Sequence, residues 1–173
     1  DFFSTDNKVD HENISLIGHS RGGGVVLIKA AEDHRVKNVI TWSSISDIGS
    51  RFPAGDELVK WKNEGVYYVQ NGRTKQQMPH FYQFFEDFEQ NENRLNIQSA
   101  IKNINQPVLL IHGENDPTVD IKEAQQLKDW QPNARLEIIP DADHVFNTRH
   151  PWHKAELTKE ADLLVEKSID FLN

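Results

Sequence analysis

The sequence predicts an α/β fold in which a mostly parallel sheet is flanked by helices. Apolar runs of strand length alternate along the chain with amphipathic stretches of helix length. A strand, a helix and a second strand follow one another within about 30 residues, which is the length of a βαβ unit. Residues 107–112 are almost entirely apolar, as expected for a strand buried on both faces. A length of 173 residues favours one domain.

The first predicted unit lies near the start of the chain. An apolar strand at residues 14–17 stops at Gly18, and a helix follows over about residues 22–32. Residues 36–43 combine β-branched side chains with a tryptophan and read as a second strand. Because a helix connects them, the two strands should be parallel. The loop at residues 44–55 leaves the carboxyl end of the second strand, where such sheets bind ligands.

Residues 56–105 break this rhythm. Asn71-Gly72 lies between extended segments and predicts a hairpin. Four phenylalanines follow at helical spacing, and three isoleucines mark a further short helix: Phe81, Phe84, Phe85 and Phe88, then Ile97, Ile101 and Ile104. We interpret about residues 50–105 as a cap-like insertion covering the site, within a single domain of residues 1–173. The phenylalanines are expected to form the core of the insertion rather than an acyl-binding wall.

The βα alternation resumes after the insertion. Residues 107–112 and 134–139 are the third and fourth predicted strands. Asp120 is placed to cap the helix between them, with Glu123 completing a capping box. An amphipathic helix over about residues 157–172 should cover the sheet.

Composition excludes several classes of function. The net charge is −8 and the basic residues are scattered, which argues against a nucleic-acid or anionic-membrane surface. The chain has no cysteine, so neither disulfide nor thiolate chemistry is available. It contains no run of about 18 apolar residues that could span a membrane, and no signal peptide is visible. We expect a cytoplasmic protein that needs no cofactor.

The strongest chemical signal is the segment Gly18-His19-Ser20-Arg21-Gly22, which matches the nucleophile elbow G-x-S-x-G. The elbow holds a serine clear of its neighbours on a sharp strand-to-helix turn. Glycine at both flanking positions should remove Cβ atoms that would clash there. The helix N-terminus favours developing negative charge, and the backbone N–H of Arg21 is the expected oxyanion donor.

A serine nucleophile needs a base, and the base needs an orienting carboxylate. Asp116 follows the third predicted strand and His144 follows the fourth. All three groups should therefore meet at the carboxyl edge of the sheet, in the chain order serine, acid, histidine. Asp47 also follows a strand and is the alternative acid. Weaker alternatives are Asp120, Asp141 and Asp143, the last of which is expected to shape its loop.

Other candidates carry less specific signals. His150 and His153 could suggest a metal, but no third ligand is evident, and a solvated loop is favoured. His19 and His112 lie at strand ends and should help to shape the site. The candidates for substrate contact are three aromatic side chains, Trp42, Phe52 and Phe146.

Three segments resemble the catalytic segments of the α/β-hydrolase superfamily: Gly-His-Ser-Arg-Gly-Gly, His-Gly-Glu-Asn-Asp-Pro and Asp-Ala-Asp-His-Val-Phe. The chain is most similar to the bacterial dienelactone-hydrolase-like and prolyl-oligopeptidase-like groups, whose insertion the stretch from Trp61 through Gly65 and Asn71 to Arg73-Thr74 resembles. The resemblance implies an α/β-hydrolase fold and acyl-enzyme hydrolysis by Ser20, Asp116 and His144. Dienelactone hydrolases usually carry a cysteine nucleophile, so Ser20 points to carboxylesterase chemistry.

The resemblance covers only the carboxyl-terminal part of the family's fold. The family's first strands and its second oxyanion donor precede the elbow. We therefore expect either a fragment or a chain that pairs with a separate amino-terminal segment. The predicted function is hydrolysis of a small carboxylic ester. The alternatives are a short-peptide peptidase, which would cleave an amide, and a non-catalytic fragment used for binding or assembly.

Overall fold

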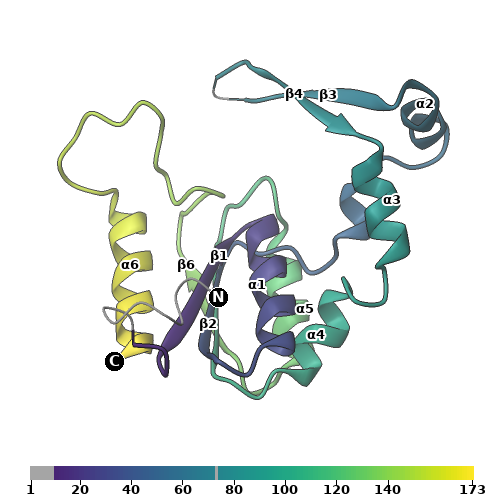
Figure 1. The fold of residues 1–173 in the computed structure, drawn as a ribbon. Coiled ribbons are helices and arrows are strands. Elements are labelled where there is room, and N and C mark those ends of the chain that lie inside the picture. The colour runs from purple at the N-terminus through teal and green to yellow at the C-terminus, as the bar shows by residue number, and fades with distance from the viewer. Residues whose placement is uncertain (1–9, 73) are drawn as a thin grey trace. The chain divides into compact units, whose positions relative to one another are not determined.

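The structure, a computed structural model, describes residues 10–72 and 74–173 (Figure 1). The chain divides into two compact units. The sheet unit comprises the chain up to Ser46 together with Ile97–Asn173, and the insertion unit is Asp47–Asn96. In the described ranges, no helix has both the length and the apolarity needed to cross a membrane.

The sheet unit contains four strands: β1 (Ile14–His19), β2 (Val36–Trp42), β5 (Val108–Gly113) and β6 (Arg135–Ile139). Their order in the sheet is β1-β2-β5-β6, and every neighbouring pair is parallel. The predicted parallel sheet is therefore confirmed. Because all four strands run the same way, the segments that follow them meet at one edge of the sheet.

Helices cover both faces of this sheet (Figure 1). One face carries α1 (Arg21–Glu32), α4 (Ile97–Asn103) and α5 (Ile121–Trp130), and α6 (Lys159–Leu172) lies on the other. The Asp120 carboxylate accepts a hydrogen bond from the N–H of Lys122, which confirms it as the cap of α5. Thr158 caps α6 in the same way, through the N–H of Ala161.

The core fills the space on either side of the sheet. Every residue of β5 is buried, as its apolar sequence predicts. One core cluster includes β-strand, loop and α6 side chains: Ile40, Leu109, Ile111, Ile139, Ala142, Phe146, Ala161 and Leu164. Fully burying one such aliphatic or aromatic side chain is worth about 1.5–3 kcal/mol. This core fixes the strand ends from which the candidate catalytic residues project.

The insertion unit contains a 3₁₀ turn, η2 (Gly49–Arg51), followed by α2 (Asp56–Glu64), a β-hairpin and α3 (Gln83–Gln90). The hairpin pairs β3 (Val66–Gln70) with β4 (Gln77–Phe81) in antiparallel register, so the predicted hairpin is confirmed. Its connection is longer than an Asn-Gly turn and runs over residues 71–76. Arg73, part of the stretch that carries the family resemblance, lies outside the described residues.

Two predictions about the insertion need correction. Phe81 ends β4 and is 61% exposed, whereas Phe84, Phe85 and Phe88 lie on α3 around Phe52, with ring centroids 4.9–5.3 Å from its ring. The insertion unit ends at Asn96 rather than near residue 105, because α4 packs in the sheet unit. Ile97 fits against Gly24 of α1, where a Cβ would lie 2.5 Å from the Ile97 Cδ1.

Candidate active site

Ser20 occupies a single-residue turn between β1 and α1. Its backbone has φ 56° and ψ −122°, a conformation that costs a non-glycine residue free energy. Three backbone hydrogen bonds hold the turn. The N–H of Ser20 donates to the carbonyl of Trp42 at 2.8 Å, and the carbonyl of Ser20 accepts from the N–H groups of Gly23 at 3.0 Å and Ile45 at 3.4 Å. This strained geometry is that of a nucleophile elbow.

The glycines around Ser20 differ in their need for space. A Cβ on Gly18 would collide with the carbonyl of Gly22 and lie 2.8 Å from the Gly23 nitrogen. At Gly22, by contrast, a Cβ would meet nothing within 4 Å. The second crowded position is Gly23, where a Cβ would lie 3.1 Å from the Cα of Ser44. The expected clash is therefore confirmed at Gly18 and wrong at Gly22.

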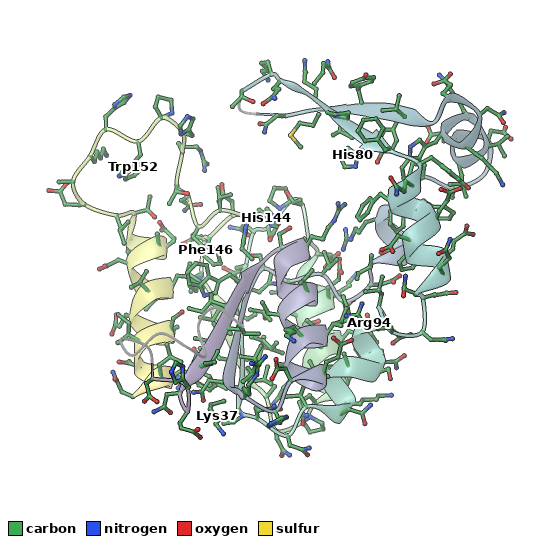
Figure 2. The ribbon with its side chains drawn as sticks, viewed as in Figure 1. Lys37, His80, Arg94, His144, Phe146 and Trp152 are labelled. Carbon is green, nitrogen blue, oxygen red and sulfur yellow. The ribbon has the colours of Figure 1, made fainter. Side chains whose placement is uncertain are left out.

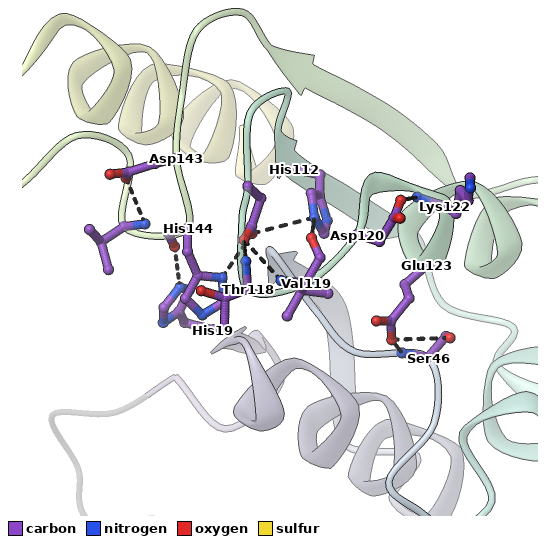
Figure 3. Close-up of polar contacts among 12 residues, drawn as sticks. His19, Ser46, His112, Thr118, Val119, Asp120, Lys122, Glu123, Asp143 and His144 are labelled. Atoms are coloured by element: carbon purple, nitrogen blue, oxygen red, sulfur yellow. Dashed lines mark hydrogen bonds and ion pairs between the residues drawn. The ribbon is translucent and has the colours of Figure 1, made fainter. Parts of the chain in front are cut away.

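Asp116 and His144 are hydrogen-bonded to each other. Oδ2 of Asp116 lies 2.8 Å from Nδ1 of His144 (Figure 3). Oδ1 accepts from the N–H groups of Thr118 and Val119 at 2.8 and 2.9 Å. Because an ionised carboxylate can only accept, Nδ1 of His144 carries the proton, which leaves Nε2 of a neutral ring free of one. That tautomer is the one a general base requires.

The environment of Asp116 keeps its carboxylate ionised. The side chain is fully buried. Burial on its own raises the pKa of Asp116, but hydrogen bonds from Val119, His144 and Thr118 together lower it further than burial raises it. The net pKa lies below the ordinary value for aspartate. A buried carboxylate that remains charged can orient an imidazole and stabilise its cation.

Two residues at the end of β5 fix the Asp116 turn. The buried His112 donates from Nε2 to the carbonyl of Val119 at 2.9 Å, and the same nitrogen lies 3.5 Å from Asp116 Oδ2. Gly113 is pressed against the loop after β6, since a Cβ there would lie 2.5 Å from the Ala142 oxygen. This close approach, which sequence reasoning missed, brings the loops of Asp116 and His144 together. The only sequence signal for it was a glycine directly at a strand end.

The loop that carries His144 is braced by Asp143. Oδ1 of Asp143 accepts from the N–H groups of Val145 and Asn147 at 3.0 and 2.8 Å, and Oδ2 pairs with Arg149 at 2.8 Å. Burial raises the pKa of Asp143, while these hydrogen bonds and Arg149 lower it to a net value below the ordinary one. Asp143 therefore shapes the loop, as expected.

The remaining alternative acids have other positions. Asp47 lies in the insertion unit, where its carboxylate accepts from the N–H groups of Gly49 and Ser50. Asp120 caps α5, and Asp141 is an exposed loop residue with φ 59°. Among the described acids, the one hydrogen-bonded to the His144 ring is Asp116.

His19 connects the elbow to the His144 loop. Its Nε2 lies 2.7 Å from the backbone oxygen of His144, and the two rings are 4.7 Å apart (Figure 3). Within the part of the chain that the structure describes, no hydrogen bond joins the Ser20 hydroxyl to the His144 ring. Nucleophile–base hydrogen bonds often tighten only in the complex with substrate.

The three candidates for substrate contact lie in packed surroundings. Phe146 is 3% exposed and belongs to the core cluster, just beyond His144 in the same loop (Figure 2). Trp42 packs against that cluster, and its indole N–H donates to Ser168 Oγ at 3.1 Å. Phe52 is the centre of the aromatic core of the insertion unit. Phe146 is too deeply buried to present its ring at the surface, and substrate contact by Trp42 or Phe52 stays a prediction.

The predicted loop histidines lie as expected. His150 and His153 are both exposed. Among the described residues, no group of three or more histidine, cysteine, aspartate or glutamate side chains is arranged to hold a metal ion.

Residues 62–151, more than half of the chain, match the family described as alpha/beta hydrolase fold. The chain belongs to this family. The match includes Asp116 and His144, and Ser20 lies before its first residue. The α/β-hydrolase fold is thus established from the carboxyl-terminal part of the chain, and the elbow is read from its own sequence and geometry.

Two curated relatives come from Bacillus subtilis (strain 168). The uncharacterized peptidase YtmA is 27% identical over 123 residues, which cover 70% of this chain and 42% of YtmA. The uncharacterized peptidase YuxL is 28% identical over 151 residues, which cover 84% of this chain and 21% of YuxL. The chain therefore spans less than half the length of either relative.

Solved structures share the α/β-hydrolase fold. The esterase domain of a Rhodothermus marinus protein is 28% identical with a TM-score of 0.61, over 85% of this chain and 57% of that domain. Est1E from Butyrivibrio proteoclasticus, solved with ferulic acid, has a TM-score of 0.71 at 18% identity, over 99% of this chain and 62% of Est1E. The second likeness supports the fold alone.

Proposed function

We propose that this α/β-hydrolase chain carries the catalytic triad of a serine hydrolase that cleaves a carboxylic ester. The observation that carries the proposal is the 2.8 Å hydrogen bond between Asp116 and His144, formed at the edge of the sheet where β1 ends in a strained Ser20. His19 links this serine's strand to the same loop. An acid, a base and a nucleophile thus follow strands that end at the same edge of the sheet.

The first half-reaction acylates the serine. Ser20 Oγ attacks the acyl carbonyl while Nε2 of His144 accepts the hydroxyl proton, and Asp116 stabilises the imidazolium that forms. The carbonyl oxygen becomes an oxyanion at the N-terminus of α1, where the backbone N–H of Arg21 is the proposed donor. When the intermediate collapses, the bond to the alcohol oxygen breaks, and His144 returns the proton to that oxygen.

The second half-reaction releases the acid. His144 takes a proton from a water molecule, whose oxygen attacks the acyl carbonyl of the Ser20 ester. Collapse of the second oxyanion breaks the bond to Ser20 Oγ, and His144 gives the proton back to the serine. One ester and one water are consumed for each acid and alcohol formed.

Similarity supports two substrate classes for this triad. The esterase domain from Rhodothermus marinus favours an ester. YtmA and YuxL are named as peptidases and favour the alternative, cleavage of short peptides. We place the chain in the dienelactone-hydrolase-like and prolyl-oligopeptidase-like part of the family on its three catalytic segments. A substrate panel of short-chain nitrophenyl esters and dipeptide amides separates the two classes by kcat/KM.

The test of the proposed function is labelling and turnover in the intact protein. A fluorophosphonate probe should label Ser20, and S20A should abolish both labelling and ester turnover, because no other hydroxyl occupies the elbow. An exposed serine outside the elbow, Ser99 on α4, supplies the control variant S99A, which should behave as the unmodified protein. Turnover retained in S20A would reject Ser20 as the nucleophile. A folded protein that the probe does not label would leave the non-catalytic alternative.

We also propose that β1 accepts a further strand on its open side. In the described sheet β1 pairs only with β2, and Ile17 of β1 is 45% exposed. The strand carries no lysine, arginine, aspartate or glutamate that would discourage edge pairing. An additional segment of a longer protein, or a separate chain, would supply that strand.

A further inference from the structure

The residue before the nucleophile is hydrogen-bonded to the main chain of the proposed base. Nε2 of His19 lies 2.7 Å from the carbonyl oxygen of His144, although the two residues are 125 positions apart. A carbonyl oxygen can only accept, so Nε2 of His19 must carry a proton. The rings of the two histidines lie 4.7 Å apart and are tilted by 41°.

This hydrogen bond reaches across the sheet. β1 and β6 are the two outermost strands of the described sheet, so the loop after β6 must fold back over the carboxyl ends of β5 and β2 to meet His19. The hydrogen bonds from Val145 and Asn147 to Asp143 stay within that loop. At the end of β5, Gly113 packs closely against the carbonyl of Ala142 in the same loop. His19 fastens it to β1, the strand that ends at Ser20.

We propose that His19 is a positioning residue for the base. Asp116 holds the ring of His144 through Nδ1, and His19 holds its main chain through the carbonyl oxygen. Two restraints on one residue, from two different strands, leave the imidazole little freedom to turn away from Ser20. The inference rests on the proposed function. Nε2 of His19 cannot itself accept the serine proton, because it already carries the proton that it donates to the His144 carbonyl.

The test compares two substitutions of His19 in the intact protein. H19F keeps a planar ring and removes the donor, whereas the side-chain amide of H19Q can place an N–H near the position of Nε2. We expect H19F to lower kcat about tenfold with KM changed by less than about twofold, since a lost restraint misplaces the base without touching substrate binding. H19Q should recover most of the lost rate.

The matched control is H34F. His34 is an exposed histidine between α1 and β2, at the opposite end of the strands from Ser20. The H34F variant should turn over ester as the unmodified protein does, and its midpoint of unfolding should be unchanged. An equal loss of kcat in H34F, or H19Q as slow as H19F, would overturn the inference. So would H19F with the kcat of the unmodified protein.

A second measurement needs no folded H19F. Nitrogen-15 NMR of the unmodified protein should show His19 with its proton on Nε2, in a resonance that disappears in H19Q. A proton on Nδ1 and a bare Nε2 would overturn the inference directly. Failure of the proposed function looks different, because the unmodified protein would then neither turn over ester nor react with fluorophosphonate.

Discussion

Asp116 and His144 are 28 residues apart in sequence, yet Oδ2 of the first lies 2.8 Å from Nδ1 of the second. The contact follows from topology: β5 and β6 are parallel neighbours, so the loops that leave them share one edge. Gly113 removes the Cβ that would keep those loops apart. The remaining acceptor oxygen of Asp116 is saturated by the N–H groups of Thr118 and Val119, which fixes which oxygen faces the histidine.

This asymmetry predicts the effect of D116N. The amide oxygen would keep the two backbone N–H donors, so the amide nitrogen would face Nδ1 of His144 and donate to it. His144 would then carry its proton on Nε2, the wrong tautomer for a base. We expect kcat for ester hydrolysis to fall by about 10³–10⁴ with the fold intact. Steady-state kinetics and circular dichroism of the intact protein measure the two.

D47N is the matched control, because Asp47 was the alternative acid and lies in the insertion unit. Its removal should change kcat by less than about threefold. The reverse pattern, with D47N inactive and D116N active, would reassign the orienting carboxylate.

The elbow predicts opposite outcomes for two glycines four residues apart. G18A would drive a Cβ into the carbonyl of Gly22, so β1 and α1 must separate, at a cost of about 1–3 kcal/mol in the free energy of unfolding. Ser20 lies between the two elements and would move with them, so kcat should fall as well. G22A meets nothing within 4 Å and adds a better helix former to α1, which should stabilise by up to about 1 kcal/mol.

Urea denaturation of both variants checks the pair. Equal destabilisation by G18A and G22A would contradict the account, since it would mean that crowding of the Cβ at Gly18 does not distinguish the two positions. Sequence alone treated the two glycines as equivalent, because both occupy motif positions. The difference depends on which backbone atoms face each Cα, which no sequence pattern contains.

A third prediction concerns the stability of the fold at acid pH. Asp33 pairs with Arg35 at 2.7 Å and with Lys29 at 2.9 Å. The hydrogen bonds from the side chains of Arg35 and Lys29 lower the pKa of Asp33 far below its ordinary value. A carboxyl whose folded pKa is depressed contributes stability above its unfolded pKa of about 4 and loses it as the pH falls toward the folded value. D33N should therefore be less stable than the unmodified protein at pH 7, and the gap should shrink between pH 4 and pH 2.

The control is D129N, which removes an exposed carboxylate of α5 and should leave the unfolding midpoint nearly unchanged at both pH values. Midpoints measured in urea across this pH range decide the matter. If the difference in stability between D33N and the unmodified protein stays constant from pH 7 to pH 2, then lost packing, and not the charge of Asp33, is responsible.

The candidate site was predictable for those residues whose place follows from the strand directly before them in the sequence. Ser20, Asp116 and His144 each follow a recognisable strand, and parallel strands end at one edge. The same logic failed for Phe146, which follows the fourth strand but turns inward with φ 54° and joins the core. The periodicity of apolar residues also could not show that the insertion ends at Asn96. The helical spacing that begins at Ile97 is the same whether the helix packs against the insertion or against α1. The His19 hydrogen bond was likewise invisible, since its acceptor is a backbone atom.

The two edges of the described sheet differ in charge. β6 carries Arg135 and Glu137, and Glu137 pairs with Lys167 of α6 at 2.6 Å. Charged side chains of this kind protect an edge strand from further pairing. β1 reads Ile-Ser-Leu-Ile-Gly-His and carries no such protection. Of the two edges, β1 is therefore the one suited to receive another strand.

Hydrogen exchange tests this last prediction. An unpaired edge strand points alternate N–H groups at solvent, so alternate amides exchange fast. If β1 pairs with a further segment, all the amides of Ile14–His19 should be protected in the intact protein, whereas alternate amides of Arg135–Ile139 should exchange and serve as the internal reference. Alternate fast exchange in β1 as well would mean that β1 is an edge in the working protein. The exposed Ile17 would then be left uncovered, and I17K should be tolerated without loss of stability.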